Sequence, residues 1–230
     1  MESSILHKIK KGLTDIVDHH LLKHGTVLDV RKWPRSPMIE VDLHLPESDM
    51  RYWNEVLYIK FNVGSLIFRD YTPFGWDAEI STCSLLIDAG HDGPGSRWAR
   101  SLQKGDCIDY LKTDSTHQSP HLTNLVVGIG DNSSLGHLFA LQHLTLPATR
   151  FDSAVLTDNG QTGDLLSSYF NRPPVPCASE SELIEWLSVQ GFCNDHTSFY
   201  LTGNEGLVVR LRKALKNLGY FGIKAKGFWS

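Results

Sequence analysis

The first half of the chain carries its apolar residues in short alternating segments that predict β-strands. Proline, glycine and aspartate separate these segments, which cover residues 26–31, 38–45, 57–61, 65–71 and 79–87. Short strands at this spacing are typical of an antiparallel barrel or sandwich. The opening differs, because apolar residues recur there at helical spacing with lysines between them, at positions 5, 9, 13, 16 and 17. We therefore predict a helical segment over residues 1–24, followed by the barrel.

The pattern changes near residue 120, where we place a domain boundary. Residues 113–120 have the composition of a linker, and after them apolar runs alternate with helical periods. This alternation predicts strands over residues 122–129, 152–156 and 198–201 and helices over residues 134–144, 181–190 and 207–218. The predicted organisation is a β-barrel domain over residues 25–119 and a small parallel α/β domain of nucleotide-binding type over residues 120–230.

Composition and charge exclude several classes of protein. With 41% hydrophobic and 21% charged residues among 230, the chain is expected to fold into a globular structure. Its net charge of −4 gives no general attraction to nucleic acid or anionic lipid. No apolar stretch is long enough to span a membrane, and lysines and Asp15 interrupt the N-terminal apolar residues that a signal peptide would need. We therefore expect a cytoplasmic protein with no membrane or nucleic-acid partner.

Cysteine and histidine spacings do not predict a metal site. The four cysteines are scattered without a C-x-x-C pair, at positions 83, 107, 177 and 193, so reduced thiols are expected. Among eleven histidines, His19 and His20 lie near His24, while His117 and His121 are four residues apart. The second pair could bind a metal only on a helix, and Pro120 interrupts it. We expect surface histidines and no resident metal.

The segment R-D-Y-T-P at residues 69–73 is the first with candidate binding chemistry. In a strand, Arg69 and Tyr71 share one face, so a guanidinium and an aromatic ring stand side by side. Such a pair suits a flavin dinucleotide, because arginine binds a phosphate through two hydrogen bonds and tyrosine stacks on a flat ring. Thr72 adds a hydroxyl beside them. The alternative is a strand in which Tyr71 packs and Arg69 is solvated.

The second candidate segment is H-D-G-P-G-S-R-W-A at residues 91–99. It is typical of a glycine-rich loop that runs into a helix, and Ser96 is the predicted N-cap. Glycines allow close approach of the backbone, and a helix N-terminus presents unpaired N–H groups to an anion such as a pyrophosphate. The alternative is a tight connection in which Trp98 only packs.

Together these segments resemble the siderophore-interacting proteins, a family of FAD-dependent ferric-siderophore reductases within the ferredoxin reductase superfamily. The order and spacing of R-D-Y-T-P, H-D-G-P-G-S-R-W-A and the later K-G-D carry the resemblance. The segments V-V-G-I-G-D-N-S-S-L and L-T-G-N-E-G-L-V-V-R-L-R, and the terminal G-F-W, are also similar to the family. The resemblance runs from about residue 27 onward and implies a Greek-key FAD-binding barrel followed by an NAD(P)H-binding α/β domain.

By position, the resemblance implies a set of cofactor-binding residues and one substrate-binding residue. The flavin contacts would be Arg69, Tyr71 and Thr72. The pyrophosphate would lie at His91, Gly93, Gly95 and Ser96, with Trp98 packed behind. The nicotinamide side would include Asp131, Ser133 and Gly203. Lys60 would contact the anionic ferric siderophore. Phe228 and Trp229, at the chain end, either cap the flavin or a nicotinamide ring or pack against the α/β domain.

The sequence departs from the family on the nicotinamide side. Asn132 and Ser133 stand where the family has Glu-Thr, and Gly203-Asn204 stands where it has Gly-Glu. The G-x-G at Gly128 and Gly130 also lacks the third glycine of a dinucleotide fingerprint. The expected function is reduction of a ferric siderophore by NADPH or NADH through FAD, with no protein acid or base required. A reductase that takes electrons from ferredoxin or another protein, and a flavin- or siderophore-binding protein without turnover, are the alternatives.

Overall fold

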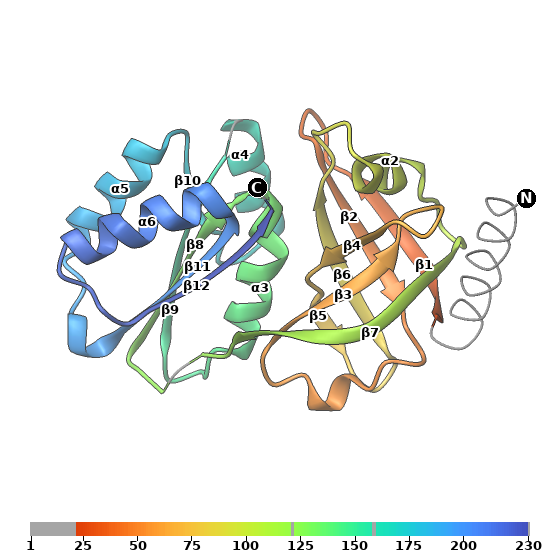
Figure 1. Ribbon diagram of the computed structural model, residues 1–230, viewed down its shortest axis with the longest axis horizontal. Coiled ribbons are helices and arrows are strands. Elements are labelled where there is room, and N and C mark those ends of the chain that lie inside the picture. The colour runs from red at the N-terminus through yellow and green to blue at the C-terminus, as the bar shows by residue number, and fades with distance from the viewer. Residues whose placement is uncertain (1–21, 121, 158–159, 230) are drawn as a thin grey trace, which may run out of the picture.

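The computed structural model describes residues 22–120, 122–157 and 160–229 (Figure 1). Two sheets organise them, a seven-stranded antiparallel sheet in the first half and a five-stranded parallel sheet in the second. The predicted helix near the N-terminus lies outside the described residues, as do His19, His20 and His121. None of the described helices is long and apolar enough to cross a membrane.

The first sheet curls into the predicted barrel. Its order is β4-β3-β7-β1-β2-β6-β5, and its edge strands β4 and β5 are consecutive in the chain, so the two edges of the sheet meet at Thr72 and Pro73. A 3-10 turn at Met50–Tyr52 and helix α2, Pro94–Ser101, complete this half. The strands are β1 Lys23–Lys32, β2 Met38–His44, β3 Val56–Asn62, β4 Phe68–Tyr71, β5 Phe74–Asp77, β6 Thr82–Asp88 and β7 Cys107–Gln118.

The second sheet has the order β10-β9-β8-β11-β12, and all its strands are parallel. The order reverses beside β8, because β9 lies on one side of it and β11 on the other. Ligands of open α/β sheets bind at the carboxyl ends of the strands at such a reversal. The strands are β8 Leu125–Asp131, β9 Arg150–Leu156, β10 Val175–Cys177, β11 Thr197–Asn204 and β12 Ile223–Trp229.

Helices cover both faces of this sheet (Figure 1). The helix α3 carries buried residues over its whole circumference, because it lies between the sheet and the barrel. The helices are α3 Leu135–Leu144, α4 Gly160–Tyr169, α5 Glu180–Val189 and α6 Glu205–Asn217, with 3-10 turns at Asn132–Ser134 and Asn194–His196.

One apolar core joins the two halves. Phe74 and Leu86 from the barrel belong to the same buried cluster as Leu135 and Phe139 of α3. Removal of apolar surface from water contributes a favourable free energy of about 25 cal/mol for each Å². A core that both domains share therefore favours a fixed relative position of the two domains. The barrel and the outer face of the second sheet each have a further core of their own.

Three expectations about local structure are wrong. Residues 113–120 are not a linker, because the strand β7 continues to Gln118 and pairs with β3 along this stretch. The strand β1 begins at Lys23, inside the segment predicted to be helical. Ser96 is not the N-cap of α2, because Pro94 begins the helix and Gly93 takes the cap position. Proline favours this earlier start, since its fixed φ suits the first helical position.

A buried histidine lies where β7 meets α3. The Nε2 atom of His137 is 2.7 Å from Gln118 Oε1, and the side-chain amide of Gln118 donates to the carbonyl of Leu201. Burial of the His137 ring lowers its pKa to about 3, and the charge of Lys226 contributes in the same direction. The ring is therefore neutral at physiological pH, and its proton on Nε2 is donated to Gln118.

This histidine should make the folded protein sensitive to acid. Between about pH 6 and pH 4 the unfolded chain binds a proton at residue 137 that the folded chain does not, so the free energy of unfolding falls as pH falls. Replacement of His137 by glutamine should flatten this dependence by about 1.4 kcal/mol for each pH unit. Urea denaturation over this pH range measures the slope. A slope that His137→Gln leaves unchanged would contradict the prediction.

Candidate active site

A cavity of about 570 Å³ opens between the barrel and the α/β domain. This size falls within the usual range for cofactor and small-molecule sites. The barrel contributes β4, the following turn and the end of β6, and the α/β domain contributes the start of α3 and the end of β12. Its polar and charged lining includes Lys60, Arg69, Asp70, Tyr71, Thr72, Asp88, Ser133, Ser134 and His137, and Phe228 and Trp229 line it as well.

The wall formed by β4 presents the arginine and tyrosine of the R-D-Y-T-P segment. Arg69 is exposed and donates to its neighbour's carbonyl, Phe68 O, at 2.8 Å. No carboxylate pairs with it in the described part of the chain. Tyr71 stacks on Trp98 of α2, with ring centroids 5.7 Å apart and planes inclined by 20°. Burial raises the pKa of Tyr71 to about 12, so its hydroxyl stays protonated.

The glycine-rich loop lies against this wall. A Cβ atom at Gly95 would collide with the Tyr71 hydroxyl and would touch Cγ of Arg69. A side chain at position 95 would therefore displace Tyr71 and Arg69, the two residues that the sequence suggests for binding a flavin dinucleotide. Ser96 is buried in the first turn of α2, which begins at this loop. The structure thus brings the two candidate segments together, although residues 74–90 separate them in the chain.

A smaller cavity of about 200 Å³ adjoins the first at the carboxyl ends of β8 and β11. Asp88, Ser133 and Trp229 line both cavities. The indole Nε1 of Trp229 donates to Ser133 Oγ at 2.8 Å, and its ring lies 5.9 Å from that of His91. The C-terminal tryptophan therefore stands between the two cavities.

Asp131 organises the smaller cavity from the end of β8. Its carboxylate accepts hydrogen bonds from the hydroxyl of Ser133 and from the backbone N–H of Asn204, the latter at 2.8 Å. A Cβ atom at Gly203 would overlap this carboxylate, and φ at Gly203 is +113°, so only glycine fits. Asn132 Oδ1 is buried here and has no hydrogen-bond partner among the described residues. A ligand that donates a hydrogen bond would satisfy this atom.

Lys60 and Phe228 line the larger cavity, and Tyr58 and Lys226 lie beside them. The Nζ atoms of Lys60 and Lys226 lie 5.2 Å and 5.7 Å from the centroid of the Tyr58 ring. Phe228 meets this ring edge-on at 6.4 Å. Lys60 forms an ion pair with Asp70 at 2.9 Å, and this hydrogen bond raises the pKa of Lys60. No carboxylate pairs with Lys226 among the described residues.

The structure therefore gathers most of the residues that the sequence nominates. Lys60, Arg69, Tyr71, Thr72 and Ser133 line the larger cavity, whereas His91, Asp131 and Ser133 line the smaller one. Gly95 and Trp98 contact Tyr71, and Gly203 contacts Asp131. Gly93 begins α2, and Ser96 lies one turn into it without the capping role expected of it.

The sequence did not single out Tyr58, Asp88, His137 or Lys226, which the structure places in or beside these cavities. The period-two spacing of a strand could have indicated two of them. Tyr58 lies on the same strand face as Lys60, and Lys226 lies on the same strand face as Phe228. For His137 the signal was a histidine within the otherwise apolar residues 135–141 of α3. Nothing in the sequence marks Asp88, which lies at the end of β6 beside the loop.

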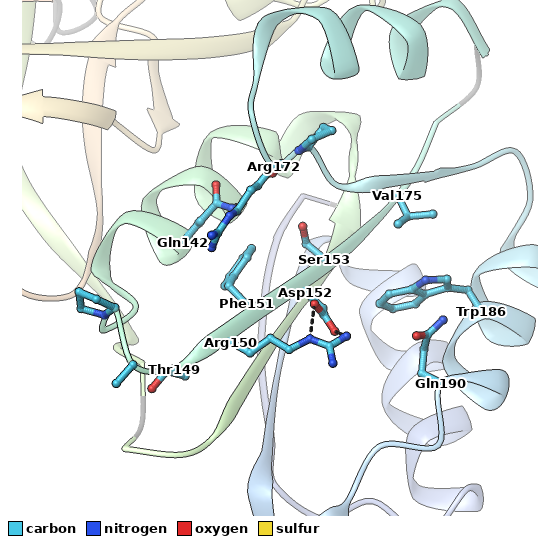
Figure 2. Close-up of a pocket in the computed structure, with 13 residues that line it drawn as sticks. Gln142, Thr149, Arg150, Phe151, Asp152, Ser153, Arg172, Val175, Trp186 and Gln190 are labelled. Atoms are coloured by element: carbon cyan, nitrogen blue, oxygen red, sulfur yellow. Dashed lines mark hydrogen bonds and ion pairs between the residues drawn. The ribbon is translucent and has the colours of Figure 1, made fainter.

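A third cavity, of about 730 Å³, lies apart from these two (Figure 2). It forms at the amino end of β9, where Arg150 pairs with Asp152 and where Arg172, Phe151 and Trp186 line the walls. This is the opposite end of the sheet from Asp131 and Asn204. It therefore contains none of the residues that the sequence nominates.

No family model matches the sequence, and no curated protein matches it. Solved structures do match. A siderophore-interacting protein from Acinetobacter baumannii has a TM-score of 0.73 and 14% identity over 90% of both chains. One from Aeromonas hydrophila has a TM-score of 0.70 and 17% identity over 91% of this chain and 98% of that one. The chain has the two-domain fold of the ferredoxin reductases.

A third solved structure, from a reductase of another kind, has the same fold. A ferredoxin NADP⁺ reductase from Neisseria gonorrhoeae, whose structure holds FAD and NADP, has a TM-score of 0.67 and 16% identity over 90% of this chain and 99% of that one. The ferredoxin-reductase fold accounts for the curled barrel, the five-stranded parallel sheet and their order in the chain. At these identities the likeness shows the fold and leaves the ligands of this chain to be argued from its own residues.

Close packing at Gly95 provides a test of the site. Replacement of Gly95 by alanine should weaken FAD binding by at least about tenfold, because the added methyl group displaces the Tyr71 ring and Arg69. The nearest atom is the Tyr71 hydroxyl oxygen, so the double variant Gly95→Ala, Tyr71→Phe should recover part of the loss. Fluorescence titration with FAD measures the affinities, and circular dichroism confirms that each variant folds. Equal FAD affinity in wild type and Gly95→Ala would place the cofactor elsewhere.

Proposed function

We propose that the protein is an FAD-dependent oxidoreductase that reduces a ferric siderophore with electrons from NADPH or NADH. One observation carries the proposal above all others. Arg69 and Tyr71, against which Gly95 of the glycine-rich loop packs, line a single cavity together with Lys60. Lys226 lies beside Phe228 of the same cavity. A flavin in that cavity would therefore lie beside a wall that attracts anions.

The residues present fit FAD. The Arg69 guanidinium is exposed and open to a phosphate, and the absence of a side chain at Gly95 lets Tyr71 pack against the loop beside it. The start of α2 offers backbone N–H groups to a pyrophosphate. Tyr71 offers a ring that Trp98 already holds in place by stacking, so little rotamer freedom is lost when a ligand binds.

Bound FAD would supply the redox chemistry, accepting a hydride from the nicotinamide and giving up electrons singly to Fe(III). The chain itself would bind and orient the reactants. Thr72 would present its hydroxyl or its amide to the flavin edge, and Phe228 and Trp229 would exclude water from the opposite wall. His137 stays neutral beneath Phe228, at a ring distance of 5.7 Å, so it adds no positive charge at the base of the cavity.

The substrate side of the proposal rests on charge. Ferric chelates of the catecholate type are anionic, and Lys226 would attract them from the edge of the cavity. Lys60, the predicted substrate contact, would act together with Asp70, so its net attraction is weaker than that of a free lysine. Reduction to Fe(II) loosens the chelate, because anionic oxygen ligands bind the less charged ion more weakly.

A protein electron donor is the second candidate, and the smaller cavity favours it. Asp88 and Asp131 line this cavity, and its one arginine, Arg210, is paired with Glu180 at 2.9 Å. A pyridine nucleotide brings phosphate groups that need free cations near them. A one-electron donor such as a ferredoxin would instead reach the flavin across the protein surface and would need no such cation.

A sequence of additions to one anaerobic cuvette distinguishes these functions. The FAD-loaded protein should lose its visible absorption on addition of NADPH or NADH and regain it when a ferric catecholate follows. Flavin that neither nucleotide bleaches, but that photoreduction bleaches and the ferric chelate reoxidises, would support the protein donor. Photoreduced flavin that the chelate leaves bleached would contradict both functions.

In steady-state assays, Lys226→Gln should raise KM for the ferric chelate about fivefold with little change in kcat. This corresponds to the loss of one partly exposed charge interaction of about 1 kcal/mol. Lys213→Gln, on the exposed face of α6, is the matched control and should leave KM unchanged.

A further inference from the structure

Three side chains of metal-binding type converge on the barrel away from the cavities described above. His24 lies near the start of β1, and Cys107 and Asp109 lie at the start of β7. In the antiparallel ladder His24 pairs directly with Asp109, and Cys107 lies opposite Thr26. Because side chains two residues apart share a strand face, all three point to the same side of the sheet. One ligand atom from each lies within 4.8 Å of the others.

We propose that His24, Cys107 and Asp109 form a binding site for a divalent cation of the zinc type. Tetrahedral zinc with bonds of ordinary length holds a nitrogen and an oxygen ligand about 3.3 Å apart, and a nitrogen and a sulfur ligand about 3.6 Å apart. In the structure the three ligand atoms lie within 4.8 Å of one another, and the Nδ1 atom of His24 is 2.9 Å from Asp109 Oδ1. Small side-chain rotations would complete the geometry without moving the strands.

The chemistry of the three ligands favours zinc over magnesium or calcium. A thiolate and an imidazole suit borderline and soft cations, whereas magnesium and calcium prefer oxygen ligands throughout. Cys107 is a free and exposed thiol, and His24 is exposed, so an ion can reach both from solvent. A water molecule would take the fourth position. Binding requires the thiolate, so it would release a proton and would strengthen as pH rises.

The backbone holds the site in place before an ion arrives. The N–H of His24 donates to Glu47 Oε1 at 2.9 Å, and the ladder fixes His24 against Asp109. The Glu47 carboxylate also adds negative charge beside the cluster, and this charge favours a cation. Short sequence spacing could not reveal the site, because His24 and Asp109 are 85 residues apart.

A bound ion would connect the first strand of the barrel to its last. The strands β1 and β7 pair on the side of the barrel that faces away from the five-stranded sheet (Figure 1). An ion that binds the folded chain better than the unfolded chain raises stability by mass action. The effect is independent of the flavin, because none of the three residues lines either interdomain cavity.

Cobalt is the probe for this site, since a cobalt–thiolate bond produces a charge-transfer band in the near ultraviolet. The full-length protein is stripped with a chelator, kept reduced and titrated with Co²⁺. The band should appear with one equivalent and should disappear when Zn²⁺ is added in competition. Zn²⁺ alone should raise the melting temperature of the same protein.

Matched cysteine variants test whether the site is the one proposed. Cys107→Ser should abolish the band, and His24→Ala should weaken Zn²⁺ binding by at least about tenfold. Cys193→Ser removes an exposed cysteine outside the cluster and should change neither result. Circular dichroism confirms that each variant is folded. Absence of the band in the wild-type protein, or its persistence in folded Cys107→Ser, would overturn the proposal.

Discussion

The close approach of α3 to the barrel at Gly136 is the contact on which the site depends. A Cβ atom at this position would lie 2.9 Å from the carbonyl oxygen of Thr72, which is a backbone atom that cannot rotate away. Only glycine therefore allows the start of α3 to reach the turn between β4 and β5. Thr72 follows Tyr71 directly, so this contact sets the carboxyl end of the parallel sheet against the R-D-Y-T-P segment.

The cavity follows from this contact because apolar packing surrounds it. Phe74, Leu86 and Phe139 fill the space beside Gly136, so the domains meet through a continuous core. Polar side chains line the cavity where that core ends, at Asp88, Ser133 and His137. The result is a cavity with fixed walls from both domains, which is how a protein orients a cofactor without further rearrangement.

The sequence predicted the elements and motifs whose patterns are local. Period-two segments marked most of the barrel, and strand–helix alternation marked the parallel sheet. Residues 113–118 were misjudged because they are polar and half exposed, while the backbone hydrogen bonds to β3 that make them a strand leave no trace in composition. The strand β12 was missed although residues 223–226 alternate apolar and polar side chains, because Gly227 interrupts the alternation after only four residues.

The candidate site residues also differ in whether a local sequence pattern indicates them. Arg69, Tyr71 and Gly95 were nominated because two short motifs at a definite spacing carried a family resemblance. Lys226 and His137 were not, because their importance comes from neighbours on other strands, Tyr58 and Gln118. The cluster at His24 and Cys107 is the extreme case, since its members meet only in the barrel ladder.

The central claim is that Arg69, Tyr71 and the loop at Gly95 bind the dinucleotide form of flavin, and comparison of FAD with FMN tests it most directly. Fluorescence titration of the flavin-free protein measures both affinities under one set of conditions. If the pyrophosphate contacts the loop and Arg69, FAD should bind at least about tenfold more tightly than FMN. Equal affinity for the two flavins, or binding of neither, would contradict the account.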